Sequence, residues 1–206
     1  SGYVNHANGR AGVFINNSGG NALTTFGLLQ FQGNNAANGR FLKSTDNFGT
    51  AVWASLTRNE ILKLGPAAFY SHISTNEATM GSRGISMTTA TGSFHANVSL
   101  PDGATITGIK IYYVDNDGVS PATGLGLISW GLQKMTNSGA GSAYSNVFNG
   151  PITNISANTN ILFAAQNFSE VVNNATTFYR VVVSMPASLN LVLVGAEISY
   201  SYTVNN

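Results

Sequence analysis

Cysteine is absent from this chain of 206 residues, and charged side chains are scarce. The missing thiols exclude a disulfide scaffold and any metal site built on thiolates. Asp, Glu, Lys and Arg make up 8% of the residues, against roughly 25% in ordinary globular proteins, and the net charge is +1. Because the sequence has so few cations and no run of Lys and Arg, we expect no nucleic-acid partner.

Long apolar runs are missing as well. No stretch approaches the roughly 20 residues of a membrane-spanning helix, so we expect no membrane insertion. Hydrophobic residues still make up 43%, which is enough for a buried core. Amides, hydroxyls and glycines provide the surface polarity that charges do not. This composition is typical of secreted or cell-surface β-proteins, of fibres and of carbohydrate-facing modules.

The N-terminal part of the chain differs from the rest. NHANGR at residues 5–10 returns as NAANGR at residues 35–40, and this spacing indicates a repeated supersecondary unit. The apolar pieces here are short and far apart, so we expect them to lie against a partner chain or against the main domain. Residues 58–64, RNEILKL, place their apolar side chains on one helical face, and the Gly-Pro pair that follows ends this predicted helix. We therefore divide the chain into residues 1–64 and 65–206.

From residue 67 onward, apolar and polar residues alternate with the period of two that β-strands produce. The alternating runs are residues 93–100, 105–114, 177–185 and 192–204. In the first run, one face carries Phe94, Ala96, Val98 and Leu100. In the second, Ile109, Ile111 and Tyr113 share one face, and Ile106, Lys110 and Tyr112 share the other. In the last, one face carries Val192, Val194, Ala196, Ile198, Tyr200, Tyr202 and Val204.

These strands, separated by recurrent turn signals, predict an all-β fold: an antiparallel β-sandwich of jelly-roll type that follows an extended N-terminal stalk or assembly segment. The strict alternation of residues 192–204 predicts a firm register. This long strand is also a candidate edge that accepts a strand from a neighbouring copy. Residues 167–174, NFSEVVNN, fit one helical turn or a loop equally well.

Two segments resemble a known family. In residues 29–55, LQFQGNNAANGRFLKSTDNFGTAVWAS, the matching positions are Leu29, Gln30, Phe31, Gln32, Gly39, Leu42, Ser44, Asp46, Gly49, Ala51 and Trp53, with Thr45 inserted. This pattern resembles the stalk motif of large secreted proteins of Bacteroidota-type bacteria, which are tail-fibre-like surface proteins. Residues 66–204, through LPDGATITGIKIYYVDND and LVGAEISYSYTV, resemble the β-sandwich heads that follow such stalks. The resemblance implies a trimeric or filamentous assembly and carries no catalytic motif.

A cluster of acids, Asp115-Asn116-Asp117-Gly118, follows the second alternating run. Alternating carboxylates before a glycine resemble the start of a calcium loop, so Asp115 and Asp117 are a candidate calcium site. The full loop pattern needs further acids, and residues 119–121 supply none. Because Asp, Asn and Gly are the preferred turn residues, a turn that ends the strand is the favoured interpretation.

Catalytic constellations are not apparent in the sequence. A glycosidase needs two carboxylates facing each other, and Asp102, in a Pro-Asp-Gly turn, is separated from Asp115 by a whole strand. The histidines His6, His72 and His95 are scattered, and His95 lies on the polar face of its strand as a surface or groove residue. No nucleophile elbow or phosphate loop occurs. We therefore predict no enzyme, no catalytic residue and, apart from the candidate calcium, no cofactor.

Several aromatic residues are candidates for contacts. Tyr70, Trp130, Tyr144 and Phe148 fit either a sugar-stacking platform or the core, and the core is favoured for Trp130. The candidates for subunit contacts are Phe14, Phe26, Leu29, Phe31, Trp53, Tyr200 and Tyr202. Tyrosine is enriched at such interfaces, and charge is depleted there.

The sequence thus predicts a secreted, non-enzymatic structural subunit of a homo-oligomeric fibre or surface appendage. Its partners are copies of itself, in a trimer or filament. The alternative is an adhesin head that binds a surface glycan or a receptor.

Overall fold

The computed structural model describes residues 40–45, 47, 51–71, 78–89, 91–116, 129–136, 144–152 and 158–204. These residues form β-strands and one short 3₁₀ helix, η1 (Pro66–Ala68), and they contain no α-helix. Nothing in this described part is a helix of the length and apolarity that a membrane crossing requires. The chain divides into two compact units, Ser1–Ala54 and Ser55–Asn206.

In the first unit, the described residues are strand β1 (Arg40–Ser44) and the beginning of strand β2 (Ala51–Leu64), which are neighbours in a sheet. Several large apolar side chains here are exposed, namely those of Phe41, Leu42 and Val52, and Trp53 is half-buried. Of the other predicted contact residues in this unit, Phe14, Phe26, Leu29 and Phe31 lie outside the described residues.

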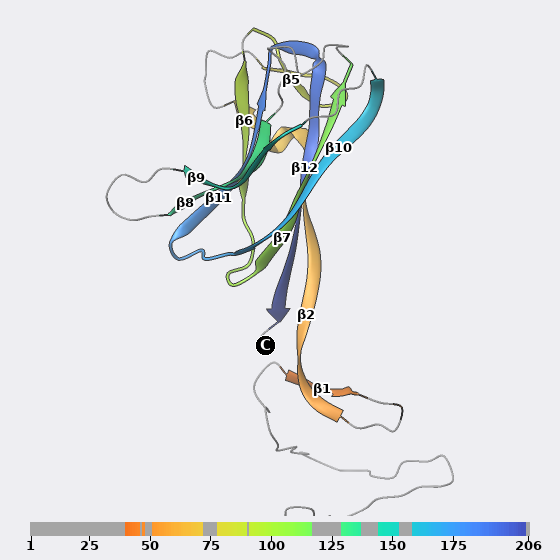
Figure 1. Cartoon of the computed structure of the whole chain (residues 1–206), viewed down its shortest axis with the longest axis vertical. Helices are drawn as coiled ribbons and strands as arrows, with labels where there is room; N and C mark the ends of the chain where they lie inside the picture. The colour runs from red at the N-terminus through yellow and green to blue at the C-terminus, as the bar shows by residue number, and fades with distance from the viewer. Residues whose placement is uncertain are drawn as a thin grey trace, which may run out of the picture. The chain divides into compact units, whose positions relative to one another are not determined.

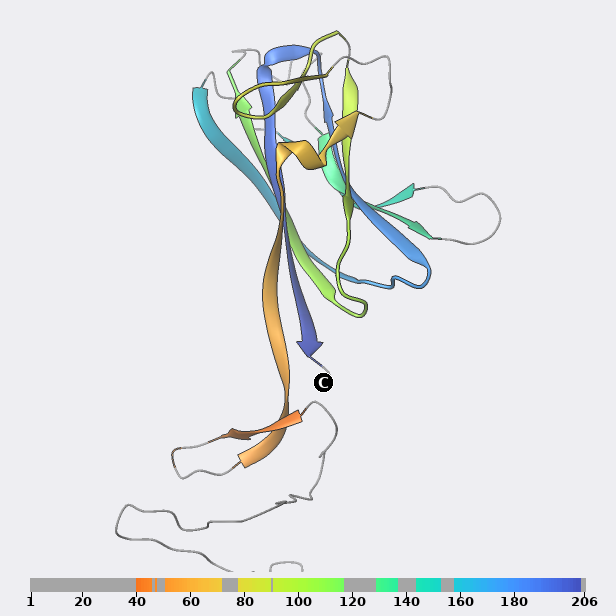
Figure 2. The same cartoon turned by 180° about the vertical axis from the view of Figure 1, so that it is seen from behind.

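The second unit is a sandwich of two antiparallel sheets, as the sequence predicts (Figures 1 and 2). In the larger sheet, β12 (Ser188–Val204) lies between β7 (Thr105–Asp115) on one side and β2 and β5 (Ile85–Met87) on the other. Beyond these strands lie β10 (Asn158–Val171), paired with β7, and β4 (Ala78–Met80), paired with β5. The smaller sheet has the order β3 (Tyr70–Ser71), β6 (Gly92–Val98), β11 (Thr177–Met185), β8 (Ser129–Thr136) and β9 (Tyr144–Pro151).

The core lies between the two sheets and is built from the inward face of each strand. In β11 every second residue is buried, from Thr177 to Met185, and the residues between them are more exposed. The predicted inward set of residues 93–100 is confirmed, since all four of its apolar side chains are at most 9% exposed. The side chains buried most completely are Met87, Phe94, Ile106, Ile111, Leu132, Val172, Val181, Val183, Met185, Leu193 and Ile198.

Two β-bulges alter the predicted faces. In β12 the register with β7 shifts between Leu193 and Gly195, so Leu191 and Leu193 are buried in its first half and Ala196 and Ile198 in its second. The prediction that residues 192–204 present one apolar face is therefore wrong for the part of β12 that precedes the shift. A bulge adds one residue to one strand of a pair, which transfers the side chains beyond it to the other face.

The second bulge lies in β7, where the register with β12 passes from Gly108 directly to Ile106. Ile106 therefore joins Ile109 and Ile111 in the core instead of sharing the polar face with Lys110. Alternation alone gave the wrong face for Ile106, because the sequence offers no sign of the extra residue, Thr107.

Two element types differ from the sequence prediction. Residues 58–64 are part of strand β2 and not a helix, and they pair with β12 from Leu64–Ala196 onward. An isolated helix of this length is marginal in water, whereas the strand gains a full ladder of hydrogen bonds. Residues 167–171 likewise belong to β10, and a turn follows at residues 174–176. The predicted end at Gly65-Pro66 is confirmed, since β2 ends at Leu64.

The Pro-Asp-Gly turn before β7 is confirmed. Ala104 N–H donates to the Pro101 carbonyl at 3.1 Å, and Gly103 adopts a φ of +73°, which a residue without Cβ accepts readily. The Asp102 carboxylate accepts a hydrogen bond from Asn174 N–H at 2.8 Å. Asp102 therefore ties this turn to the β10–β11 connection.

Candidate functional site

The outer face of the smaller sheet, which we call the platform, gathers polar and aromatic side chains. Its central strand is β11, whose outward residues are Phe178, Arg180, Val182 and Ser184. Phe178 is 58% exposed, although it belongs to the central strand of a five-stranded sheet, where it lies near the beginning of that strand. A large aromatic ring left open at such a position is a candidate contact surface.

One row of polar side chains crosses the platform at right angles to the strands. In the register of the sheet, Arg180 lies between Asn97 of β6 and Gln133 of β8, and Gln133 lies opposite Asn146 of β9. Arg180 Nε donates to Gln133 Oε1 at 2.9 Å, and Gln133 Nε2 donates to Asn146 Oδ1 at 3.0 Å. These hydrogen bonds fix the side chains of Arg180, Gln133 and Asn146 relative to one another. We call these three residues and Asn97 the polar row.

An aromatic row runs beside the polar row. It consists of Phe178, its cross-strand neighbour Met135 of β8, and Tyr144 of β9, which is paired with Met135. The Arg180 guanidinium carbon lies 3.4 Å from the centroid of the Tyr144 ring. This cation–π contact connects the two rows and fixes the plane of the guanidinium.

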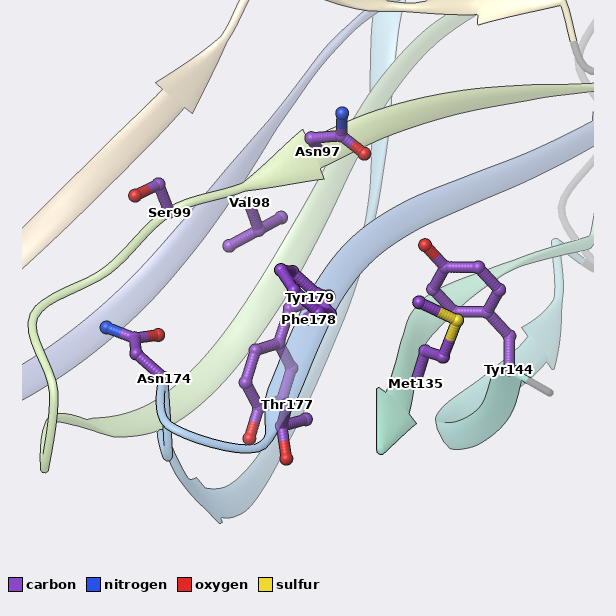
Figure 3. Close-up of a pocket in the computed structure, with 9 residues that line it drawn as sticks. All are labelled: Asn97, Val98, Ser99, Met135, Tyr144, Asn174, Thr177, Phe178 and Tyr179. Carbon is purple, nitrogen blue, oxygen red and sulfur yellow. The ribbon is translucent and has the colours of Figure 1, made fainter. Parts of the chain in front are cut away.

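A cavity of about 550 Å³ opens over the aromatic row. Figure 3 shows its walls: residues at the end of β6 on one side, Met135 and Tyr144 on the other, and the start of β11 with Asn174 between them. The lining residues are Asn97, Val98, Ser99, Met135, Tyr144, Asn174, Thr177, Phe178 and Tyr179. None of these nine is an acid, a histidine or a lysine, so the cavity offers hydroxyls, amides and aromatic surface.

Tyr70 extends the platform at its far edge. Its ring is 47% exposed and contacts His95 edge-on, with the ring centroids 6.0 Å apart. Its hydroxyl donates to Oδ1 of Asn97, a member of the polar row, at 3.4 Å. His95 is only 3% exposed, so the prediction of a surface or groove histidine is wrong, because Tyr70 covers the ring. His6 and His72 lie outside the described residues.

Charged groups beneath the platform are paired. Lys134 Nζ lies 2.8 Å from Glu170 Oε1, and the Tyr179 hydroxyl donates to the same oxygen at 3.1 Å. Burial, together with the charge of Glu170 and the hydrogen bond to it, raises the pKa of Tyr179 to about 12. Tyr179 is therefore neutral below the cavity at physiological pH.

The candidate calcium site is only partly described. Asp115 is 4% exposed at the end of β7, opposite Leu191, and its charge adds to burial in raising the pKa of Tyr113. The part of the chain that the structure describes holds no group of three or more His, Asp or Glu that could bind a metal ion. Asp117 lies outside the described residues, so the calcium site stays a prediction.

The remaining aromatic candidates belong to the core or its margin. Trp130 is 3% exposed, which confirms its assignment to the core, and Phe148 packs against it with the centroids 4.9 Å apart. Tyr200 and Tyr202 are stacked on each other and pack against the core, and burial raises the pKa of Tyr200. Their role as subunit contacts stays a prediction.

Sequence reasoning named Tyr70 and Tyr144 as candidates for sugar stacking but missed Phe178 and the polar row. The signal for Phe178 and Arg180 was present, since both fall on the outward positions of the alternating run TFYRVVV. The pairing of Arg180 with Gln133 and Asn146 depends on the strand order, which no local pattern encodes.

Comparisons with known proteins find likenesses among solved structures. The chain matches no protein-family model, and no curated protein matches it. A solved structure of the C-terminal CBM6 of LamC, a marine laminarinase from Zobellia galactanivorans, is 12% identical with a TM-score of 0.38, covering 68% of this chain and 99% of that chain. The C-terminal family 22 carbohydrate binding module of Clostridium thermocellum Xyn10B is 11% identical with a TM-score of 0.30, and the match covers 82% of this chain and 96% of that chain.

A protein chain of the cowpea mosaic virus empty virus-like particle is 14% identical with a TM-score of 0.31, covering 74% of this chain and 85% of that chain. All three TM-scores are below 0.5.

Proposed function

We propose that the chain is a non-catalytic carbohydrate-binding module of a secreted or surface protein, and that the platform is its binding site. The observation that carries this proposal is the exposed ring of Phe178 in the aromatic row, beside a hydrogen-bonded row of amides and a guanidinium. A sugar ring presents a C–H face and an edge of hydroxyls. The aromatic row can stack against the C–H face, and the polar row can form hydrogen bonds with the hydroxyls at the edge.

The polar row suits a linear glycan that crosses the strands. From β6 to β9 it covers three strand spacings, roughly 14 Å, which is long enough for several consecutive sugar rings. The row is already ordered by its own hydrogen bonds before a ligand arrives. Less side-chain entropy is therefore lost on binding, which favours affinity.

Binding without catalysis fits the residues of the platform. Glycoside hydrolysis in its usual form needs two carboxyl groups on either side of the scissile bond. None of the described outward residues of the platform strands is an acid. The carboxylate beneath them, Glu170, is bound to Lys134 and Tyr179.

Affinity electrophoresis tests the proposal with a panel of soluble neutral and acidic polysaccharides. We expect at least one polysaccharide to retard the wild-type chain, because the aromatic row provides a stacking surface. Replacing Phe178 with alanine should raise the dissociation constant obtained from this retardation at least tenfold, since the substitution removes the ring most open for stacking. The matched control is Phe163→Ala, which removes a ring that is 61% exposed on β10 of the other sheet. If no polysaccharide retards the wild type, or if both variants lose binding equally, the platform is not a glycan site.

Self-assembly into a fibre or surface appendage is a second candidate function. Among the described residues, β10 pairs with β7 on one side only and carries Ile161, Phe163 and Val171 as exposed apolar side chains. An unpaired strand edge accepts a strand from another copy. The edge predicted from the sequence, β12, is paired on both sides, so β10 takes its place in this hypothesis. A head of this kind at the end of an assembled stalk is compatible with glycan binding.

A further inference from the structure

Arg180 differs from the other cations near the sandwich core. Lys63 and Lys110 both lie within 4.0 Å of Glu197, and Lys134 is paired with Glu170. Among the described residues, no carboxylate lies within ion-pair distance of Arg180, whose side chain contacts Gln133 and Tyr144 instead. A half-buried guanidinium without a counter-ion is costly, because its charge is partly desolvated and only a neutral amide and an aromatic ring compensate it.

The geometry around Arg180 directs it toward an incoming group. Nε donates to Gln133 Oε1, and the guanidinium plane rests on the Tyr144 ring. Nε and one face of the guanidinium are thereby occupied. Within the part of the chain that the structure describes, the two terminal nitrogens, with four N–H donors, have no acceptor. Such donors bind a carboxylate or sulfate through two parallel hydrogen bonds.

The surroundings also favour an anion over a neutral sugar hydroxyl. The described outward residues of β6, β8, β9 and β11 include amides, hydroxyls and aromatic rings but no Asp or Glu that would repel it. Asn97 and Gln133 flank Arg180 in the register, and the side-chain amide of each has an N–H that can donate to the same group. On a chain whose net charge is only +1, this is a local feature and not a general attraction to polyanions.

We infer that the ligand is an acidic glycan, a polymer with carboxylate or sulfate groups, and that Arg180 is the residue that recognises the anion. The inference deepens the proposed function and rests on it, because the same platform holds the sugar rings. Phe178 contacts the rings, Tyr144 holds the guanidinium in place, and Arg180 with Asn97 contacts the acidic substituent.

The test uses pairs of polymers that share a backbone and differ in charge: polygalacturonate with methyl-esterified pectin, alginate with its propylene glycol ester, and dextran sulfate with dextran. Dissociation constants come from affinity electrophoresis of the full chain at low and at high NaCl. We expect at least one acidic polymer to bind more tightly than its neutral partner, and high salt to reduce this preference, since ions screen the exposed part of the interaction.

The variant Arg180→Gln removes the charge and keeps a side chain that can hydrogen-bond to Gln133. We expect it to lower affinity for the acidic polymer by about tenfold to a hundredfold, the usual effect of losing a charge-assisted hydrogen bond, and to leave the melting temperature near that of the wild type. Arg180→Lys keeps the charge without the planar fork and should give an intermediate loss. The matched control is Arg58→Gln on β2, which makes the same change in net charge at an exposed position off the platform and should bind like the wild type.

Each outcome decides between the two proposals. If the wild type binds neutral and acidic partners equally and Arg180→Gln changes nothing, the acidic-glycan inference is wrong and the carbohydrate-binding proposal stands. If Arg58→Gln loses as much affinity as Arg180→Gln, the binding is non-specific charge attraction and the inference is again wrong. If no polymer in the panel binds, both proposals fail.

Discussion

Tyr179 illustrates how a single residue connects the platform to the core. Its ring is 5% exposed, and its hydroxyl contacts Glu170 Oε1 at 3.1 Å and the Val171 carbonyl at 3.2 Å. Burial disfavours the ionised form of this hydroxyl, and ionisation would also place a second negative charge beside Glu170. The structure therefore favours the neutral phenol, which is why the pKa of Tyr179 rises to about 12 from the ordinary 10.0.

This pKa predicts a loss of stability at alkaline pH. Because the folded protein holds the phenol proton more tightly than the unfolded chain, this contribution to stability is complete below about pH 10 and is lost as the pH rises through about 12. We expect the free energy of unfolding in urea to fall more between pH 9 and pH 11.5 in the wild type than in Tyr179→Phe, which has no proton to lose there. Equal decreases in the two proteins would contradict the assignment.

At the scale of elements, the bulge in β12 depends on Gly195. A Cβ built at this position would lie 2.5 Å from the carbonyl oxygen of Leu64, the last residue of β2. The close approach lets β12 continue past the end of β2 while its side chains change faces. A side chain here would separate two strands of the larger sheet.

The variant Gly195→Ala should therefore lower the free energy of unfolding by about 1–3 kcal/mol, the usual cost of forcing an extra methyl into a packed site. Gly65→Ala is the matched control, because Gly65 has extended backbone angles and a Cβ there would meet nothing within 4 Å. We expect that control to change stability by less than about 0.5 kcal/mol. Chemical denaturation measures both, and equal effects would show that the close approach at Gly195 is not the cause.

The same elements indicate what the sequence can predict. Alternation identified the strands β6, β7, β11 and β12 and, in β6, the correct inward face, because a half-buried strand repeats every second residue. It failed at Ile106 and Val192, where bulges change the face, and at residues 58–64, where pairing with β12 overrides a short helical spacing. Bulges and strand order are tertiary features, so the polar row of Arg180 and Gln133 was also missed.

At the scale of the whole molecule, self-assembly is the open alternative to a solitary binding module. The first unit exposes Phe41, Leu42 and Val52, and residues 55–64 belong to the second unit through their pairing with β12. If the chain assembles, the full chain should have a molar mass several times 21.5 kDa. A chain lacking residues 1–54 should then be a monomer if the first unit drives assembly, and should remain an oligomer if the β10 edge does. Size-exclusion chromatography with light scattering measures both, and a monomeric full chain would contradict this hypothesis.

The central claim is that a glycan lies across the platform. Nuclear magnetic resonance tests it most directly, since the polar row carries side-chain amides with their own signals at Asn97, Gln133 and Asn146. When the retarding polysaccharide is added as a short oligomer, we predict saturable shifts of these amide signals and of the backbone around Phe178. Shifts confined to β10 and the outer face of the larger sheet, or no saturable shift, would contradict the claim.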